Sequence, residues 1–387
     1  MPKEVSLSLS LSLSHEQIVM WPGLVSSTKI LTKTLSSNFV TDFPTSPESF
    51  LHLPTLDPEH VNITQNYNIF VSTWNVGGVA PTGDLNIDDL LDTHNTRCDI
   101  YVLGFQEVVP LTTPNVLGLA KKKVSKKWNS LIRKTLNKKS RMSSKVTKPN
   151  TESSDEFRCL VSKRMVGLLI SVWLRNDLYQ LVQNPNVSCV GCGIMGRLGN
   201  KGSVSVRFHL GDTSFCFVCS HLASGGGEGD GEIRNSNAIE IFSRTSFPTT
   251  NGRSSFHLPK RILDHDRVVL FGDLNYRISL PDKEARSLVN MNDWNTLIKN
   301  DQLRSEIIDG QFRAWKEGAI NFPPTYKYFP NSDEYFEKDY ETKRSPAWCD
   351  RIIWTGDDLK QILYNRSESK LSDHRPVKAI FSARCKV

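Results

Sequence analysis

The chain lacks any hydrophobic run long enough to cross a membrane. A membrane-spanning helix needs about 18 to 20 consecutive apolar residues, and the longest apolar run here is MVGLLISVWL, from Met165 to Leu174. Arg164 and Arg175 stand directly at its two ends, which favours a buried strand. Hydrophobic residues make up 38% of the chain and charged residues 23%, enough to bury a core. These features exclude an integral membrane protein.

Cysteine is scarce, and a recognisable secretory signal is lacking. Eight cysteines in 387 residues are too few for a disulfide-stabilised scaffold. Near the N-terminus leucine alternates with serine in VSLSLSLSLS, which weakens the apolar core of a signal peptide, and no small-residue cleavage site follows. Met20 remains open as an alternative start. We therefore expect a reducing compartment, and hence a cytoplasmic or nuclear protein.

The sequence also lacks the motifs of several other enzyme classes. No cysteine has an arginine six positions later, so the cysteine-nucleophile phosphatase loop is absent. The GxGxxG match from Gly191 to Gly196 is followed by a strand pattern, whereas a dinucleotide fold needs a helix there. Two CxxC pairs have zinc-like spacing, but Cys216 and Cys219 lie within a strand pattern, where residues three apart face opposite sides. We expect buried free cysteines.

Positive charge is concentrated in one stretch. Between Lys121 and Lys148 there are 12 Lys or Arg and no acid, and subtracting these from the formal net charge of +7 leaves −5 on the rest of the chain. The apolar residues at its start fall on one helical stripe: Leu117, Ala120, Val124, Trp128 and Leu131. The pattern predicts a surface helix followed by a solvated insertion. An anionic membrane, nuclear import and nucleic acid remain open as partners of this stretch.

From Tyr67 onward, short apolar runs alternate with polar turns and a few helical patterns. The predicted strands are NIFVSTW, DIYVLGF, MVGLLISVWL, SVSVRFHL, SFCFVCS, RVVLFGD, RIIW and VKAIF. The predicted helices are 85–96, 116–138, 232–245 and 283–300, and the predicted loops are 139–156 and 224–231. We expect an N-terminal extension with a low-complexity start over residues 1–60. A single α/β sandwich domain follows over residues 61–385, with the basic helix and insertion at about 116–156.

Polar residues stand at the ends of several predicted strands. They are Asn75, Glu107, His221, Asp273 with Asn275 and, before the last strand, Asp373 with His374. Neighbouring strand ends meet at one edge of a sheet, where the sites of layered α/β folds usually lie. Each residue alone is explained by a turn or a cap. Together, their carboxylate and amide oxygens predict a Mg²⁺ site.

A second set of residues, late in the chain, is basic or aromatic. The segments PPTYKY (Pro323 to Tyr328) and KRSPAWCDRIIW (Lys343 to Trp354) supply four donor side chains: Tyr326, Lys327, Arg344 and Arg351. Each phosphate brings roughly −1.5 to −2 charges at neutral pH, so a polyphosphate requires several cations. The stretch from Gly196 to Gly202, with Lys201, adds backbone amides that suit an anion nest. Ordinary surface salt bridges are the alternative, and a structural role also fits Arg351.

Eight motifs, in order along the chain, resemble the inositol polyphosphate 5-phosphatase family, especially its plant branch. They are STWNVGG, DIYVLGFQEVVPL, MGRLGNKGSVSVRF, CSHLASG, FGDLNYRI, PPTYKY, RSPAWCDRIIW and SDHRPV, within about Tyr67 to Phe381. The resemblance implies a DNase I-like four-layer α/β/β/α sandwich of the endonuclease/exonuclease/phosphatase superfamily. It also implies Mg²⁺-dependent removal of the 5-phosphate. The implied substrates are phosphatidylinositol 4,5-bisphosphate and 3,4,5-trisphosphate, or soluble inositol 1,4,5-trisphosphate.

The same resemblance implies roles for the residues at the strand ends. Glu107 should bind Mg²⁺, with Asn75 close by. Asp273 should orient and deprotonate the attacking water, while Asn275 and His221 hold the scissile phosphate. These five residues would then form the metal and water side of the site.

The resemblance also implies roles for residues later in the chain. His374 should stabilise charge on the phosphate, and Asp373 should orient His374. Tyr326, Lys327 and Arg344 should bind the 4-phosphate, and Lys201 is a further candidate for substrate contact.

Two other functions remain open at this point. A nuclease on the same fold would use similar carboxylate, amide and histidine groups, although the TYKY and RSPAWCDR segments argue against it. An inactive phosphoinositide-binding adaptor is the other, and the presence of every expected catalytic residue argues against that one. The expected partners are phosphoinositide lipids at a membrane surface or soluble inositol polyphosphates, with peripheral membrane contact and no nucleic acid. Oligomeric state is undetermined.

Overall fold

The computed structural model describes residues 39–40, 64–93, 95–110, 112, 123–138, 156–193, 196, 198–248, 258–337 and 344–387. Residues 38–387 form one compact unit. Most of the expected N-terminal extension, Met20 included, and residues 139–155 of the expected insertion lie outside the described residues. Within the described part, no helix is both long enough and apolar enough to span a membrane.

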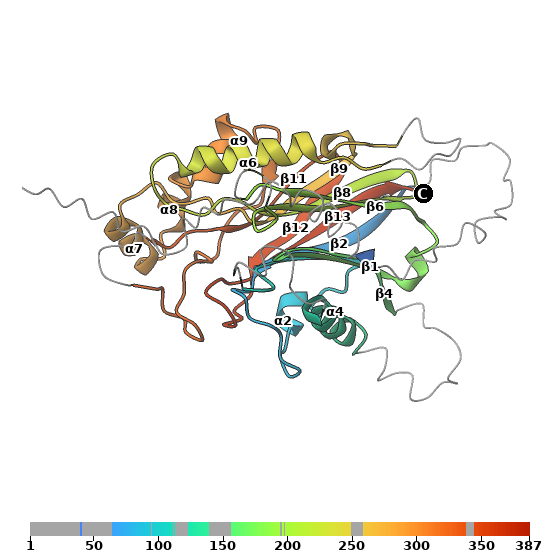
Figure 1. Cartoon of the computed structure of the whole chain (residues 1–387), viewed down its shortest axis with the longest axis horizontal. Helices are drawn as coiled ribbons and strands as arrows, with labels where there is room; N and C mark the ends of the chain where they lie inside the picture. The colour runs from blue at the N-terminus through green and yellow to red at the C-terminus, as the bar shows by residue number, and fades with distance from the viewer. Residues whose placement is uncertain are drawn as a thin grey trace, which may run out of the picture. The chain divides into compact units, whose positions relative to one another are not determined.

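Two β-sheets stack face to face in this unit (Figure 1). The first has the order β1 (Phe39–Val40), β4 (Phe157–Met165), β5 (Leu168–Arg175), β3 (Ile100–Gln106), β2 (Thr64–Asn75), β13 (Val377–Lys386), β12 (Leu359–Arg366). The second has the order β10 (Lys316–Glu317), β11 (Asp350–Thr355), β9 (Arg267–Asp273), β8 (Thr213–His221), β7 (Gly202–Leu210), β6 (Val182–Gly191). β2 runs parallel to β3, and β8 runs parallel to β9.

Alternating side chains on each strand explain why the sheets stack. On β2, Ile69 and Val71 point into the core between the sheets, where they join residues such as Phe217 and Phe271 of the second sheet. Phe70, between them in sequence, belongs to a separate cluster on the outer face of the first sheet. Because strand side chains point alternately to the two faces, an almost wholly apolar strand must be covered on both sides.

Helices provide that cover on the outer faces (Figure 1). α2 (Asp88–Leu91) and α4 (Lys123–Leu136) pack on the first sheet. α6 (Asp230–Arg244) and α9 (Gln302–Asp309) pack on the second. α7 (Asp282–Asn290) and α8 (Trp294–Lys299) add apolar residues to the core cluster between the sheets, and two short 3₁₀ helices cover Asn176–Leu178 and Ile262–Asp264. The predicted four-layer α/β/β/α sandwich is confirmed.

Several elements differ from the expectation. MVGLLISVWL is a hairpin and not one strand: β4 ends at Met165, Val166 takes a left-handed φ of 50°, and β5 starts at Leu168. The expected helix 283–300 is divided in two, because Asp293 caps α8 by accepting a hydrogen bond from the Thr296 amide. The expected helix 85–96 is ordered as a helix only over Asp88–Leu91.

Four edge strands and one helix were not expected: the edges are β1 and β12 in the first sheet and β10 and β6 in the second. β6 contains Pro185, which a strand tolerates at a sheet edge, and its pairing with β7 shifts register between Gln183 and Asn186. β12, at the edge of the first sheet, is half exposed. α9 follows α8 almost directly and begins at its own cap, Asp301.

The cysteines are arranged as the strand pattern predicts. All eight are free thiols. Cys219 lies in the core between the sheets, whereas Cys216 lies in the cluster under α6. The two side chains therefore face opposite sides of β8 and cannot share one metal ion.

Candidate active site

The strand-end residues come together because parallel strands end at the same edge. Asn75 is the last residue of β2, and Glu107 directly follows β3, its parallel neighbour. In the second sheet, His221 and Asp273 end the parallel strands β8 and β9 and stand in register with each other. The stacking of the sheets places the two edges side by side, since Asn75 contacts Asp273 directly.

Asp273 is at the centre of this cluster and is 2% exposed. Its Oδ2 atom accepts a hydrogen bond from Asn75 Nδ2 at 2.9 Å. The same oxygen lies 3.3 Å from His221 Nε2 and 3.9 Å from His374 Nε2. One carboxylate oxygen thus links residues from both sheets.

Neighbouring basic side chains keep this carboxylate ionised. Burial alone would raise the pKa of Asp273, but His374, His221 and Lys201 hold that pKa well below its usual range. Lys201 itself is buried, which lowers its pKa, and its Nζ atom contacts His221 Nε2. Asp273 is therefore a carboxylate at neutral pH, ready to accept a hydrogen bond.

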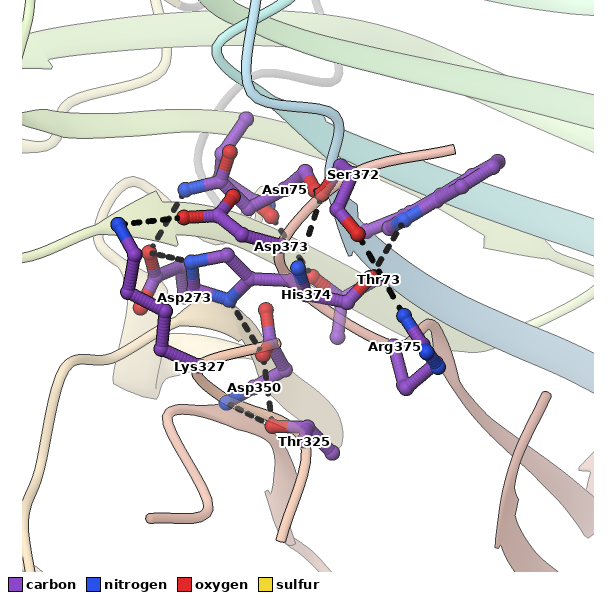
Figure 2. A network of polar contacts seen from close by, with 12 residues as sticks. Thr73, Asn75, Asp273, Thr325, Lys327, Asp350, Ser372, Asp373, His374 and Arg375 are labelled. Atoms are coloured by element: carbon purple, nitrogen blue, oxygen red, sulfur yellow. Dashed lines mark hydrogen bonds and ion pairs between the residues drawn. The ribbon is translucent and has the colours of Figure 1, made fainter. Parts of the chain in front are cut away.

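His374 carries the complementary charge. Burial opposes protonation, but Asp350 and then Asp273 raise the pKa of His374 to about 10, so the ring is an imidazolium at neutral pH. The ring Nδ1 lies 2.8 Å from Asp350 Oδ2, and Thr325 Oγ1 donates to the same oxygen at 2.7 Å (Figure 2). His374, Asp350 and Thr325 are all buried, so their geometry is fixed by packing as well as by hydrogen bonds.

The expected orienting role of Asp373 is wrong, because Asp350 makes that contact. Asp373 Oδ2 lies instead 3.1 Å from Lys327 Nζ (Figure 2). Adjacent residues in an extended segment point to opposite sides, and His374 forms an extended bridge with Tyr326. The side chains of Asp373 and His374 therefore diverge. The sequence carried one signal for Asp350, an acid at the start of the apolar strand RIIW.

The aromatic and basic residues lie against the same histidine. The Tyr326 ring centroid is 4.6 Å from that of His374. Arg344 donates a hydrogen bond to the Tyr326 hydroxyl at 2.8 Å. Arg277, which the sequence did not indicate, places its guanidinium 4.5 Å from the centre of the Tyr326 ring. Tyr326, Arg344 and Arg277 thus form one wall of the site beside His374. Lys327, which directly follows Tyr326, belongs to the same wall.

Two site residues adopt the left-handed backbone conformation, which is uncommon for residues other than glycine. Asn275 has φ of 58° and Glu107 has φ of 53°. Arg277 fixes Asn275 by donating to its side-chain oxygen at 2.7 Å, and the Asn275 amide donates to the Leu222 carbonyl at 3.1 Å. Both turns aim a polar side chain across the end of a buried strand.

The oxygen-rich side of the site suits a hard cation. Asp273, Asp350 and His374 have ligand atoms within 4.8 Å of one another and could hold a metal ion. His374, however, is an imidazolium without a free lone pair. The Glu107 carboxylate is 26% exposed and lies 3.3 Å from Asn75 Nδ2, so it presents open oxygen ligands beside Asp273.

Arg351 is part of the scaffold that supports the site. It is fully buried and pairs with Asp301 at 2.9 Å and with Glu317 at 2.5 Å. These pairs join β11 to the cap of α9 and to β10. The structural alternative for Arg351 fits these contacts.

The fold and this constellation define a class of phosphoesterases. The family described as Endonuclease/Exonuclease/phosphatase family 2 matches residues 72–380 of the chain. The crystal structure of the inositol polyphosphate 5-phosphatase domain of SPsynaptojanin, in complex with inositol (1,4)-bisphosphate and calcium ion, has a TM-score of 0.70. It is 32% identical and covers 83% of this chain and 85% of its own.

Curated relatives narrow the class to one family. Type IV inositol polyphosphate 5-phosphatase 9 of Arabidopsis thaliana is 57% identical, over 94% of this chain and 91% of its own. Type I inositol polyphosphate 5-phosphatase 8 of the same plant is 46% identical, over 81% of this chain and 70% of its own. The chain belongs to the plant inositol polyphosphate 5-phosphatase family.

Proposed function

We propose that this chain hydrolyses the 5-phosphate of phosphatidylinositol 4,5-bisphosphate and 3,4,5-trisphosphate at a membrane surface, and of soluble inositol 1,4,5-trisphosphate. One observation carries the proposal. The Asp273 carboxylate and the His374 imidazolium lie 3.9 Å apart at the strand ends, and Tyr326 packs on the same histidine. A water-activating group, a cation for the developing charge and a phosphate-binding wall therefore share one edge.

Mg²⁺ is the cofactor that we assign to this site. Glu107 would hold it, with Asn75 close by, because their oxygen atoms are the ligands that a hard cation prefers. When bound, Mg²⁺ polarises a phosphoryl oxygen and offsets charge that builds up on the leaving group.

The protein's own residues handle the water and the phosphate. Asp273 accepts a hydrogen bond from the attacking water and orients it in line with the phosphorus. Its low pKa suits a loose transition state, in which the water passes its proton to the Asp273 carboxylate late. Asn275 and His221 hold the phosphoryl oxygens, and the imidazolium of His374 stabilises charge on them.

The wall of the site beside His374 selects the substrate. Tyr326, Lys327 and Arg344 bind the 4-phosphate through one hydroxyl and two cations, and the Arg344–Tyr326 hydrogen bond of 2.8 Å already aligns two of these groups. Lys201, beside His221, is a further substrate contact. The names of the relatives and the inositol (1,4)-bisphosphate bound in the SPsynaptojanin structure support this assignment.

Phosphate release tests the proposal. Purified protein is assayed with phosphatidylinositol 4,5-bisphosphate and with inositol 1,4,5-trisphosphate, in Mg²⁺ and in EDTA. We expect Mg²⁺-dependent release that Asp273→Asn abolishes and Asp309→Asn, an exposed control on α9, leaves intact. Near-wild-type turnover by Asp273→Asn, with an unchanged circular dichroism spectrum, would refute the role of Asp273. Cleavage of duplex DNA without phosphate release would refute the substrate class.

A further inference from the structure

Helix α4 presents a cluster of unpaired lysines that the catalytic site does not use. Lys123, Lys126 and Lys127 are exposed, and the first turn of the helix carries no acid. The three ammonium groups form no ion pair with any residue that the structure describes. We refer to these three residues as the lysine cluster.

The lysine cluster opposes the electrostatics of its own helix. The N-terminus of a helix carries the positive end of the dipole, so cations there are unfavourable. Lys123 and Lys127 are also one turn apart, where like charges repel each other. Helix electrostatics therefore do not explain three lysines at this end.

Packing shows which end of α4 lies toward the catalytic edge. Trp128, the next residue, packs against Trp74 at 5.9 Å and Phe105 at 4.5 Å. Those two residues directly precede Asn75 and Gln106 at the catalytic edge of the first sheet. At the far end of the helix, Asn137 bonds to Phe157, whose strand partner Arg175 lies toward the opposite edge.

α4 therefore runs along the outer face of the first sheet, where it lies in Figure 1, with its lysine-bearing first turn toward the catalytic edge. The lysine cluster is therefore at the end of α4 that is nearer to the site. The lysine cluster and the catalytic site therefore lie toward the same edge of the first sheet.

The distribution of charge along the chain indicates which kind of partner surface the lysine cluster binds. Twelve basic residues lie between Lys121 and Lys148, and the rest of the chain is net negative, at −5. This stretch is therefore the main concentration of positive charge along the chain, and the lysine cluster is the described part of it that lies toward the catalytic edge. We propose that the lysine cluster docks on the anionic lipid surface of a membrane and holds the catalytic edge against it.

The consequence for lipid turnover rests on the proposed function, but the docking itself does not. Three lysines close to an anionic surface change the partition of a protein by roughly 10- to 100-fold. The interaction is screened within a Debye length of about 8 Å at physiological ionic strength, so binding must weaken as salt is added.

Vesicle sedimentation measures the docking directly. Full-length protein is mixed with phosphatidylcholine vesicles, with or without phosphatidylserine and without any phosphoinositide. The test variant is Lys123→Gln, Lys126→Gln, Lys127→Gln. The control variant removes the same charge at the opposite edge and is Lys260→Gln, Lys360→Gln, Lys386→Gln. Lys386 pairs with Thr64 at the start of β2, Lys260 precedes β9, and Lys360 is near the start of β12.

We expect phosphatidylserine-dependent binding that the test variant weakens at least 10-fold and the control changes less than 3-fold. Turnover of soluble inositol 1,4,5-trisphosphate should be the same in all three proteins. An equal loss of vesicle binding in both variants would overturn the proposal, and so would binding that does not depend on phosphatidylserine. Affinity for duplex DNA without affinity for vesicles would also overturn it. Failure of the proposed function appears separately, as absent phosphate release by a protein that still binds vesicles.

Discussion

Asp350 Oδ2 lies 2.8 Å from His374 Nδ1, and the two residues come from different sheets. Asp350 begins β11 of the second sheet, whereas His374 precedes β13 of the first. The contact therefore links the two sheets at the edge that carries the active site. It also sets the charge of the histidine, since Asp350 is the main group that raises its pKa.

Asp350→Asn should lower kcat by roughly 10²- to 10⁴-fold, because the imidazolium loses both its orienting partner and its charge stabilisation. The pKa of His374 is raised from 6.5 to about 10, so activity that needs the imidazolium is lost as pH rises through about 10. In the variant this alkaline limb should move to lower pH. A pH–rate profile of both proteins between pH 6 and 10.5 measures the shift.

Asp373→Asn is the matched control, because Asp373 is the weaker influence on His374 and its carboxylate pairs with Lys327. It should move the alkaline limb less than Asp350→Asn does. The free energy of unfolding depends on pH in the same direction. The stability that His374 contributes through its raised pKa is complete below pH 6.5 and is lost as pH rises through about 10. An alkaline limb that stays in place in Asp350→Asn would contradict the assignment.

Tyr326→Phe should raise KM roughly 10-fold with little change in kcat. The variant loses the hydroxyl to which Arg344 donates at 2.8 Å, but it keeps the ring that packs on His374 at 4.6 Å. Steady-state kinetics with inositol 1,4,5-trisphosphate measure the change. A matched inositol phosphate without the 4-phosphate should show no such difference, and an equal KM rise for both substrates would argue against a 4-phosphate contact.

The sequence predicted the strand ends of the site well, because buried strands that end in a polar residue are visible as local patterns. It missed Asp350, because the contact with His374 depends on how two sheets stack, and 24 residues separate the partners. Arg277 was missed for the same reason, since its target is the ring of Tyr326. The edge strands β6 and β12 were missed because half-exposed strands carry polar residues that weaken the apolar pattern.

His265 should make the fold acid-sensitive. It is buried, and burial lowers its pKa from 6.5 to about 4. A depressed histidine pKa contributes stability that is complete above pH 6.5 and is lost as pH falls toward 4, by up to about 3 kcal/mol. Urea unfolding at pH 7 and pH 5 measures this loss. In His265→Gln the difference between the two pH values should shrink, and an unchanged difference would exclude His265 as the cause.

Gly104 permits the close approach of the two sheets, and Gly104→Ala should destabilise the fold by about 1 to 3 kcal/mol. A Cβ at this position on β3 would lie 2.5 Å from Phe271 Cε2 and 2.7 Å from Cys219 Sγ, both on the opposite sheet. Urea unfolding measures the loss. Gly83→Ala, where a Cβ meets nothing within 4 Å, is the control and should change stability little. Adding Phe271→Leu to Gly104→Ala should recover part of the loss, because a smaller side chain relieves the contact; strictly additive effects would place the strain elsewhere.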